Sequence, residues 1–168
     1  MMLIRLFSSG FLIIYVLAFS GCTLKTIETT EAGNPDVLKG KVLIATQKSE
    51  FKRTVVSEIK EYLGNSVFYV KVVDVKWLPN ESADDFNAVV ILNRCMAGRP
   101  DPRVESFVDA IPDKNKVILL TTGRLDSWKP DSSEIDAMSA ASAMSETTPL
   151  ARSISDKVLD IIGSQDNP

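Results

Sequence analysis

Two short apolar runs with a helical pattern between them constrain the fold of this chain most. The runs extend from Ala88 to Leu92 and from Val117 to Leu120, and neither contains a polar residue. Between Val104 and Ile111, apolar residues recur at positions i, i+3, i+4 and i+7, which is typical of a helix with one buried face. Unbroken apolar strands suit a sheet that is covered on both faces, and strands joined by such a helix are parallel.

The alternation of strand and helix continues towards the N-terminus. We expect a strand at Lys41 to Thr46, and Ser49 is a favourable N-cap for a helix that ends at Gly64. Val67 to Val75 is rich in β-branched and aromatic residues, and its two charged residues predict a strand at the edge of the sheet. The buried face of the helix is expected to contain Val55, Val56, Ile59, Tyr62 and Leu63.

The other segments are less regular. Residues 76–86 contain proline, asparagine and three acidic residues, and we expect a loop there. The pattern weakens again after Gly123 and resumes with a last helix that begins near Pro149 and ends at Gly163. This order of elements predicts a doubly wound α/β domain with a mainly parallel sheet of about four to five strands between two helical layers.

The N-terminus has the pattern of an export signal. Residues 1–21 contain one basic residue and no acidic residue, and their apolar core from Phe11 to Phe19 is too short for a membrane-spanning helix. The sequence Phe19-Ser20-Gly21-Cys22 resembles the lipobox of bacterial lipoproteins. This resemblance implies that Cys22 is acylated, for example with palmitate, and becomes the new N-terminus. An ordinary secretory signal or an uncleaved anchor is the alternative.

The lipobox resemblance also implies a location and a domain organisation. The protein would be held by its lipid in the cell envelope on the periplasmic side, and Thr23 favours the outer membrane because it replaces the Asp that resembles an inner-membrane retention signal. Residues 22–39 have no apolar period, and we expect a flexible tether. Residues 40–164 would form the folded domain, and residues 165–168 a tail.

The composition excludes several classes of site. The 168 residues include no histidine, so catalytic triads that need one are excluded, and no metal or haem site is expected. If Cys22 is acylated, Cys95 is the other cysteine and no intramolecular disulfide is expected. The formal net charge of −3 gives no basic excess, so no nucleic-acid partner is expected.

The order of the elements and several loops resemble the flavodoxin-like family. The resemblance rests on the strand Val42 to Ala45, on Met96-Ala97-Gly98-Arg99-Pro100 after the third strand, and on Thr121-Thr122-Gly123 at the end of the fourth. In that family, flavin mononucleotide (FMN) lies at the carboxyl ends of the strands. The resemblance therefore implies an FMN site formed by Thr46, Lys48, Ser49, Met96, Ala97, Gly98, Thr121, Thr122 and Gly123.

The expected phosphate loop combines hydroxyl groups with positive charge. A phosphate group is favoured at a helix N-terminus, and Thr46 and Ser49 would supply hydroxyls there, with Lys48, Lys52 and Arg53 close by in the sequence. The loop lacks the glycine of the family pattern, and a methionine replaces the aromatic residue that stacks on the flavin ring. A flavodoxin-like scaffold without a cofactor therefore stays open as the alternative.

A second stretch also resembles a flavin motif. Asp136-Ala137-Met138-Ser139-Ala140-Ala141-Ser142 resembles the motif of exported flavoproteins in which a transferase joins a hydroxyl to the flavin phosphate. The resemblance implies that Ser142 is the acceptor, although Ala140 replaces the usual glycine. The alternative interpretation is a loosely packed helix of small residues on the sheet edge.

Two classes of function follow from these expectations. The first is FMN-dependent electron transfer by a membrane-anchored domain, with a redox protein as its partner. The second is a cofactor-free binding or accessory module that uses the same strand ends for another molecule. A carboxylate-based hydrolase is less favoured, because acidic residues in loops and near helix starts are usually solvated or act as caps.

Overall fold

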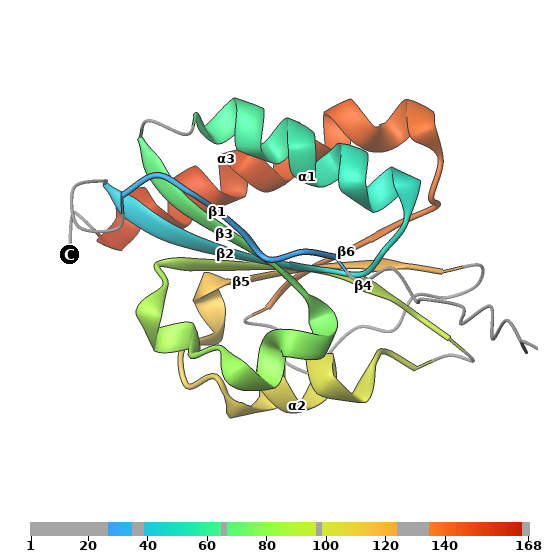
Figure 1. The fold of residues 1–168 in the computed structure, drawn as a ribbon, viewed down its shortest axis with the longest axis horizontal. Coiled ribbons are helices and arrows are strands. Elements are labelled where there is room, and N and C mark those ends of the chain that lie inside the picture. The colour runs from blue at the N-terminus through green and yellow to red at the C-terminus, as the bar shows by residue number, and fades with distance from the viewer. Residues whose placement is uncertain (1–26, 35–38, 65–66, 97–98, 124–134, 166–168) are drawn as a thin grey trace, which may run out of the picture.

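The computed structural model describes residues 27–34, 39–64, 67–96, 99–123 and 135–165 of the chain. In these residues, six strands form one sheet, and helices cover both of its faces (Figure 1). The strands are β1 (Thr30–Ala32), β2 (Gly40–Thr46), β3 (Phe68–Asp74), β4 (Ala88–Arg94), β5 (Val117–Thr122) and β6 (Asp136–Ala140). The α-helices are α1 (Glu50–Leu63), α2 (Pro102–Ala110) and α3 (Thr147–Gln165). Short 3₁₀ helices are η1 (Val75–Asn80), η2 (Ala83–Asp85), η3 (Lys114–Lys116) and η4 (Met144–Glu146).

The strand order confirms the predicted fold class. The order is β1-β3-β2-β4-β5-β6, in which β2 to β6 are mutually parallel and β1 alone is antiparallel to its neighbour among the described strands. Without β1, this is the doubly wound order of flavodoxin-like sheets, which reverses its direction of progression between β2 and β4. The chain therefore has a flavodoxin-like fold, with its topological switch point between these two strands.

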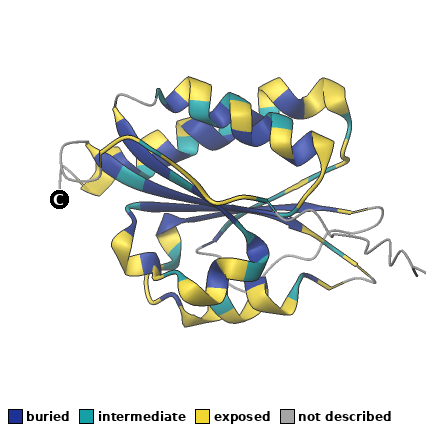
Figure 2. Cartoon of the chain, in the orientation of Figure 1, coloured by how far each residue is buried: buried dark blue, intermediate teal, exposed yellow. Residues whose placement is uncertain are grey.

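Both faces of the sheet are buried, which explains the unbroken apolar runs. Successive side chains of a strand point to opposite faces, so Ile44 and Val90 pack against α1 and α3, whereas Leu43 and Val89 pack against the α2 side. Figure 2 shows the buried strands between two helical layers whose outer surfaces are exposed. Because the faces are closed, the ends of the strands are where the sheet can offer polar side chains to a ligand.

The ends of α1 are as predicted, but one residue of its expected buried face is not buried. The Ser49 hydroxyl accepts a hydrogen bond from the Lys52 main-chain N–H at 3.0 Å, and Gly64 ends the helix with a φ of 70°. Tyr62 was expected in the core, and this was wrong, because its side chain is 47% exposed. Its hydroxyl group donates to Asp156 of α3 at 2.9 Å, so the ring lies over the surface junction of the two helices.

The N-terminal edge of the sheet differs from the expectation. β3 was predicted to be an edge strand, but β1 lies outside it, in the segment where a tether was expected. Lys71 of β3 forms ion pairs with Glu31 of β1 at 3.9 Å and with Glu81 at 2.8 Å. β1 has three residues, Thr-Glu-Ala, and is held mainly by main-chain pairing, so it leaves no apolar pattern in the sequence.

Two further segments also differ from the expectation. Residues 76–86, expected as a loop, lie largely in η1 and η2, where Leu78 and Ala83 are buried against the α2 face. The helix considered as an alternative for residues 136–144 is wrong, because Asp136–Ala140 forms the parallel edge strand β6. Small and polar side chains suit an edge strand that contributes little to the core, and that is why the strand pattern is weak.

The helix ends provide a test of the backbone assignment. Replacing Gly64 with alanine should destabilise the fold by about 1 kcal/mol, because an L-residue is strained at positive φ although there is space for the methyl group. Gly163 was predicted to end the last helix, but α3 continues to Gln165, so Gly163 lies inside it. Gly163→Ala is therefore the matched control, and it should stabilise the fold by roughly 0.5 kcal/mol through helix propensity. Urea unfolding of both variants measures the difference. Equal effects of the same sign would contradict the assignment.

Candidate functional site at the carboxyl ends of the strands

One crevice lies where the parallel strands end. Loops that follow β2, β4, β5 and β6 surround a cavity of about 530 Å³, which is within the usual size range of small-molecule sites. Parallel strands end on the same edge of a sheet, and the crevice opens at the switch point between β2 and β4, where doubly wound folds bind ligands. The lining residues are Gln47, Lys48, Ser49, Lys52, Arg94, Cys95, Thr122, Gly123, Ala141 and Ser142. We call this cavity the strand-end crevice.

The strand-end crevice is positively charged in an acidic protein. Its described lining contains Lys48, Lys52 and Arg94 but no carboxylate, whereas the whole chain has a formal net charge of −3. The N-terminus of α1 lies at the same place, and its main-chain N–H groups add a partial positive charge. The arrangement favours an anionic ligand.

Lys52 is the least solvated of these cations. Its side chain is 3% exposed, and its Nζ donates to the Gln47 Oε1 at 3.2 Å. Burial, and secondly the positive charge of Arg94, lower the pKa of Lys52 to about 7. Among the described residues, no carboxylate lies within ion-pair distance of this amine.

A second buried lysine shows how the fold usually compensates such a charge. Lys116 is 8% exposed, and its Nζ donates to the main-chain oxygens of Ala83 at 2.8 Å and of Phe86 at 3.5 Å. Asp84 lies 3.6 Å away as a counter-charge. The described part of the chain gives Lys52 neither carbonyl acceptors nor a carboxylate, so these residues balance its charge only weakly.

Gln47 links the two loops that face each other across the switch point. Its Nε2 donates to Asp101 Oδ2 at 3.3 Å, while its Oε1 accepts from Lys52. Asp101 caps α2 and accepts hydrogen bonds from Arg103 Nε at 2.8 Å and Nη2 at 2.6 Å. The hydrogen bond from the Arg103 side chain is the main reason that the pKa of Asp101 is lowered, so Asp101 stays ionised and committed to these partners.

The structure brings together five of the residues implied by the flavodoxin resemblance and by the second motif. They line the strand-end crevice from three different loops, and Ser142, which follows β6, lies on the same cavity as Ser49 at the start of α1. Ser142 is exposed, so its hydroxyl is accessible. The five are Lys48, Ser49, Thr122, Gly123 and Ser142.

The other implied residues lie elsewhere or outside the described residues. Thr46 is buried, and its hydroxyl donates to the Gln47 main-chain oxygen at 3.4 Å, outside the strand-end crevice. Thr121 is buried and does not line the crevice. Met96 is 68% exposed and pairs through its main chain with Arg99. Ala97, Gly98 and the acylation candidate Cys22 fall outside the part of the chain that the structure describes.

Sequence reasoning missed some of the lining. It named Lys52 as a nearby charge without including it in the site, and it did not include Gln47 or Arg94. A signal for Lys52 was present, because Lys52, Val55 and Ile59 have the spacing of one helix face, which places a cation on the apolar face of α1. Gln47 and Arg94 carry no such signal, since their role depends on the contact between two loops.

Two buried polar groups at the strand ends lack partners. Asn93 of β4 and Thr121 of β5 are neighbours in the sheet register. The Nδ2 of Asn93 and the Oγ1 of Thr121 have no hydrogen-bond partner among the described residues, although Asn93 Oδ1 accepts a long hydrogen bond of 3.4 Å from the Asp101 N–H. Unsatisfied groups of this kind are uncommon in protein interiors and often belong to functional sites.

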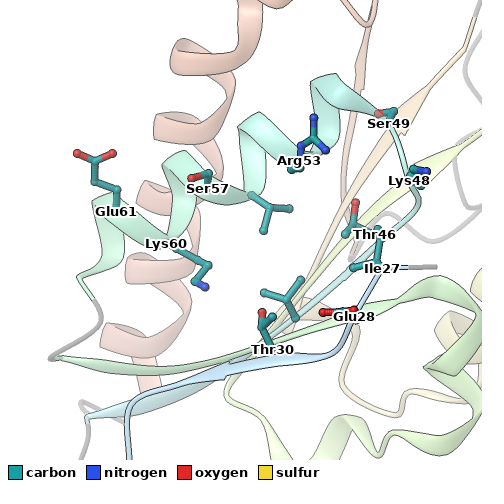
Figure 3. Close-up of a pocket in the computed structure, with 12 residues that line it drawn as sticks. Ile27, Glu28, Thr30, Thr46, Lys48, Ser49, Arg53, Ser57, Lys60 and Glu61 are labelled. Atoms are coloured by element: carbon teal, nitrogen blue, oxygen red, sulfur yellow. The ribbon is translucent and has the colours of Figure 1, made fainter. Parts of the chain in front are cut away.

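A groove adjoins the strand-end crevice along α1. It has a volume of about 730 Å³ and shares Lys48 and Ser49 with the crevice. Figure 3 shows Arg53 and Lys60 of α1 along one side of the groove, with the segment from Ile27 to Thr30 along the other. Its lining includes Val56 of α1 and Val72 of β3, so the groove offers some apolar surface beside the cationic crevice.

Comparison with known proteins gives distant likenesses in structure and none in sequence. No family model and no curated protein matches the chain. A flavodoxin from the domain Archaea matches 70% of this chain and 98% of its own, with 12% identity and a TM-score of 0.46. The flavodiiron core of Flv1 from Synechocystis matches 77% of this chain and 38% of its own, with 7% identity and a TM-score of 0.49. The lysine decarboxylase of Francisella novicida matches 73% and 17%, with 11% identity and a TM-score of 0.48.

The fold itself is established by the strand order of the sheet. The chain spans nearly the whole archaeal flavodoxin but less than half of the other two proteins. In the described part of the chain, no helix combines the length and the hydropathy needed to cross a bilayer. No cluster of potential metal ligands occurs among the same residues.

The buried amine of Lys52 predicts a pH-dependent stability. The pKa of Lys52 is about 7 in the folded chain and near 10.5 in the unfolded chain, so the cost of burying its charge is complete below about pH 7 and falls as the pH rises above that value. A Lys52→Met variant avoids this cost. It should be more stable than the parent below pH 7, and its advantage should shrink by on the order of 3 kcal/mol by about pH 9.5.

Urea unfolding of both proteins between about pH 6 and pH 9.5 measures this difference. Lys39→Met is the matched control, because Lys39 is exposed at the amino end of the sheet and its variant should differ from the parent by a constant amount. A difference between Lys52→Met and the parent that does not change with pH would show that Lys52 is solvated in the folded protein.

Proposed function

We propose that this protein binds FMN by its phosphate end in the strand-end crevice and transfers electrons to a partner protein. The observation that carries the proposal is the cationic crevice at the switch point, in which the buried Lys52 amine and the N-terminus of α1 meet without a compensating carboxylate among the described residues. A phosphate ester supplies the missing negative charge.

The donor set fits the phosphate end of FMN. Ser49, Lys52 and Arg94 would hold the phosphate group, and Thr122 with Gly123 would lie along the flavin. The bound flavin would supply one- or two-electron transfer, and the polar groups around it would tune its potential. What this chain contributes is binding, orientation of the ligand and a positive field at its anionic end.

The second candidate is a cofactor-free binding module that uses the same crevice. It is favoured by the nature of the described lining, which contains no aromatic side chain to stack on a flat ring. Met96, at the position where the family has an aromatic residue, is largely exposed. In this alternative the ligand is another small anion or the acidic segment of a partner protein.

We also propose that the domain is anchored in the cell envelope by acylated Cys22, on the periplasmic side and with the outer membrane favoured. The direction of β1 gives this anchor a consequence for the site. β1 is antiparallel to β3, so the chain enters the domain at the carboxyl end of β3, where the Ile27 N–H donates to Asp74 Oδ2 at 3.2 Å. This is the same end of the sheet as the strand-end crevice.

The anchor would hold the crevice close to the bilayer. Four residues separate Cys22 from Ile27. Five Cα-to-Cα steps reach at most about 18 Å when fully extended. The tether was predicted to include residues 22–39, but the described part of the domain already begins at Ile27, before β1, so the tether is shorter than predicted. A membrane-bound redox or accessory protein fits this geometry better than a freely diffusing partner.

An absorption spectrum of the exported domain tests the flavin proposal. The purified protein, or the protein incubated with excess FMN, should show a flavin band, and Ser142→Ala establishes how the flavin is held. A band that survives denaturation and filtration in the parent but not in Ser142→Ala would show covalent attachment, whereas a band that washes out of both would show binding by the crevice alone.

Ser145→Ala, at an exposed serine outside the crevice lining, is the control. A colourless protein that does not take up FMN would leave the binding module as the function.

Labelling with a palmitate analogue tests the anchor. The parent should incorporate the label and fractionate with membranes, whereas Cys22→Ser should lose both properties because it removes the acylated sulfur. Cys95→Ser removes the other cysteine of the chain and should behave like the parent. Membrane association of Cys22→Ser equal to that of the parent would exclude lipid anchoring at this residue.

A further inference from the structure

We infer that Lys52 and Arg94 make the strand-end crevice selective for dianionic phosphate monoesters, and that the Lys52 amine takes up a proton when such a ligand binds. The inference rests on the proposal that this crevice is the ligand site. It adds which ligands the site distinguishes and how binding depends on pH. The inference depends on the charges of Lys52 and Arg94 and on the phosphate group, so it applies to any phosphate monoester that enters the crevice and not to FMN alone.

The unused hydrogen-bond donors of Lys52 are the first observation. A protonated lysine has three N–H donors. The described residues provide Lys52 Nζ with one acceptor, the Oε1 of Gln47, although the side chain is 3% exposed and lies on the lining of the crevice. An ion in this position needs acceptors, because a buried charge is costly unless it is paired and hydrogen-bonded. The oxygens of a phosphate group in the crevice would complete its set.

The charges that face Lys52 are the second observation. Arg94, the last residue of β4, and Lys48, after β2, are positive, and Cys95 is the other titratable group on the lining. The acid nearest along the hydrogen-bond chain is Asp101, which reaches Lys52 only through Gln47 and is already held by Arg103. On α1 itself, Glu50 and Arg53 are exposed and of opposite charge. None of these groups neutralises the Lys52 and Arg94 pair.

Selectivity follows from the number of charges. A phosphate monoester carries close to two negative charges near pH 7, so it can compensate both Lys52 and Arg94. A phosphodiester carries one, so beside it either Lys52 stays neutral and forms no ion pair with the ligand, or one cation of the pair is charged and uncompensated. An uncompensated buried charge is disfavoured, so the site should discriminate strongly between the two.

Proton uptake follows because the Lys52 amine binds protons weakly in the empty crevice and more strongly beside a dianion. Burial, with the charge of Arg94, holds the pKa of Lys52 near 7, so much of the amine is neutral at about pH 8. A dianion beside it favours the ammonium form, and the pKa rises on binding. Each bound ligand then draws a proton from solvent onto Lys52 Nζ. Affinity should fall as the pH rises above about 7, by up to tenfold for each pH unit.

Calorimetric titration with methyl phosphate and dimethyl phosphate tests the inference. At about pH 8, methyl phosphate should bind at least about tenfold more tightly than dimethyl phosphate. Its apparent enthalpy should change between buffers of different ionisation heat in the sense of proton uptake. Lys52→Met and Arg94→Gln should each lose most of this preference, and Lys52→Met should also lose the proton uptake. Lys39→Met removes an exposed charge at the opposite end of the sheet and should leave both unchanged.

The outcomes separate this inference from the flavin proposal. If methyl phosphate binds with proton uptake through Lys52 but FMN does not bind, the inference stands and the flavin proposal falls. If FMN binds but Lys52→Met neither weakens methyl phosphate nor alters proton uptake, the flavin proposal stands and the inference falls. Equal affinity for the two esters, or binding of neither, overturns the inference. A ¹³C resonance of the Lys52 side chain that titrates near pH 7 and shifts upward with methyl phosphate gives the same answer without a variant.

Discussion

The burial of both faces of the parallel sheet is the constraint on which the rest of this structure depends. Strands β2, β4 and β5 carry apolar side chains towards both helical layers, so they can offer no ligand-binding groups along their length. Polar residues lie at the carboxyl ends of these strands. Thr46 and Thr122 are the last residues of β2 and β5, and Asn93 is the residue before the last in β4. The same burial that stabilises the fold therefore concentrates polar chemistry at one edge of the sheet.

The charge of Lys52 is the clearest departure from a structure built for stability alone. Lys116 shows that the fold can bury a lysine with carbonyl acceptors and a carboxylate, and Lys52 has neither kind of compensation from the residues that the structure describes. The unfavourable free energy of such a buried charge is typical of functional sites, where a bound ligand supplies the missing counter-charge. Gln47 adds to the argument because it fixes the Lys52 amine while joining the two loops of the switch point.

The sequence predicted the parts of the fold that bury apolar residues, and it missed the parts held by main-chain pairing. The runs at Ala88 and Val117 and the Ser49 cap led to the correct sheet and helices, because burial and capping are local signals. β1 and β6 are short, polar or rich in small residues, and they depend on a neighbouring strand. Five of the predicted site residues lie on the strand-end crevice. Lys52, on the apolar face of α1, was predicted only as a nearby charge, because its role depends on the charges that surround it in the folded chain.

The measurement that tests the central claim most directly is an amide chemical-shift map of the ¹⁵N-labelled domain with increasing FMN or methyl phosphate. Binding at the strand ends predicts that the largest shifts fall in residues 47–52, 94–95, 122–123 and 141–142, which come together only in the folded sheet. Shifts confined to another surface, or none with either compound, would contradict the claim that this crevice is the binding site.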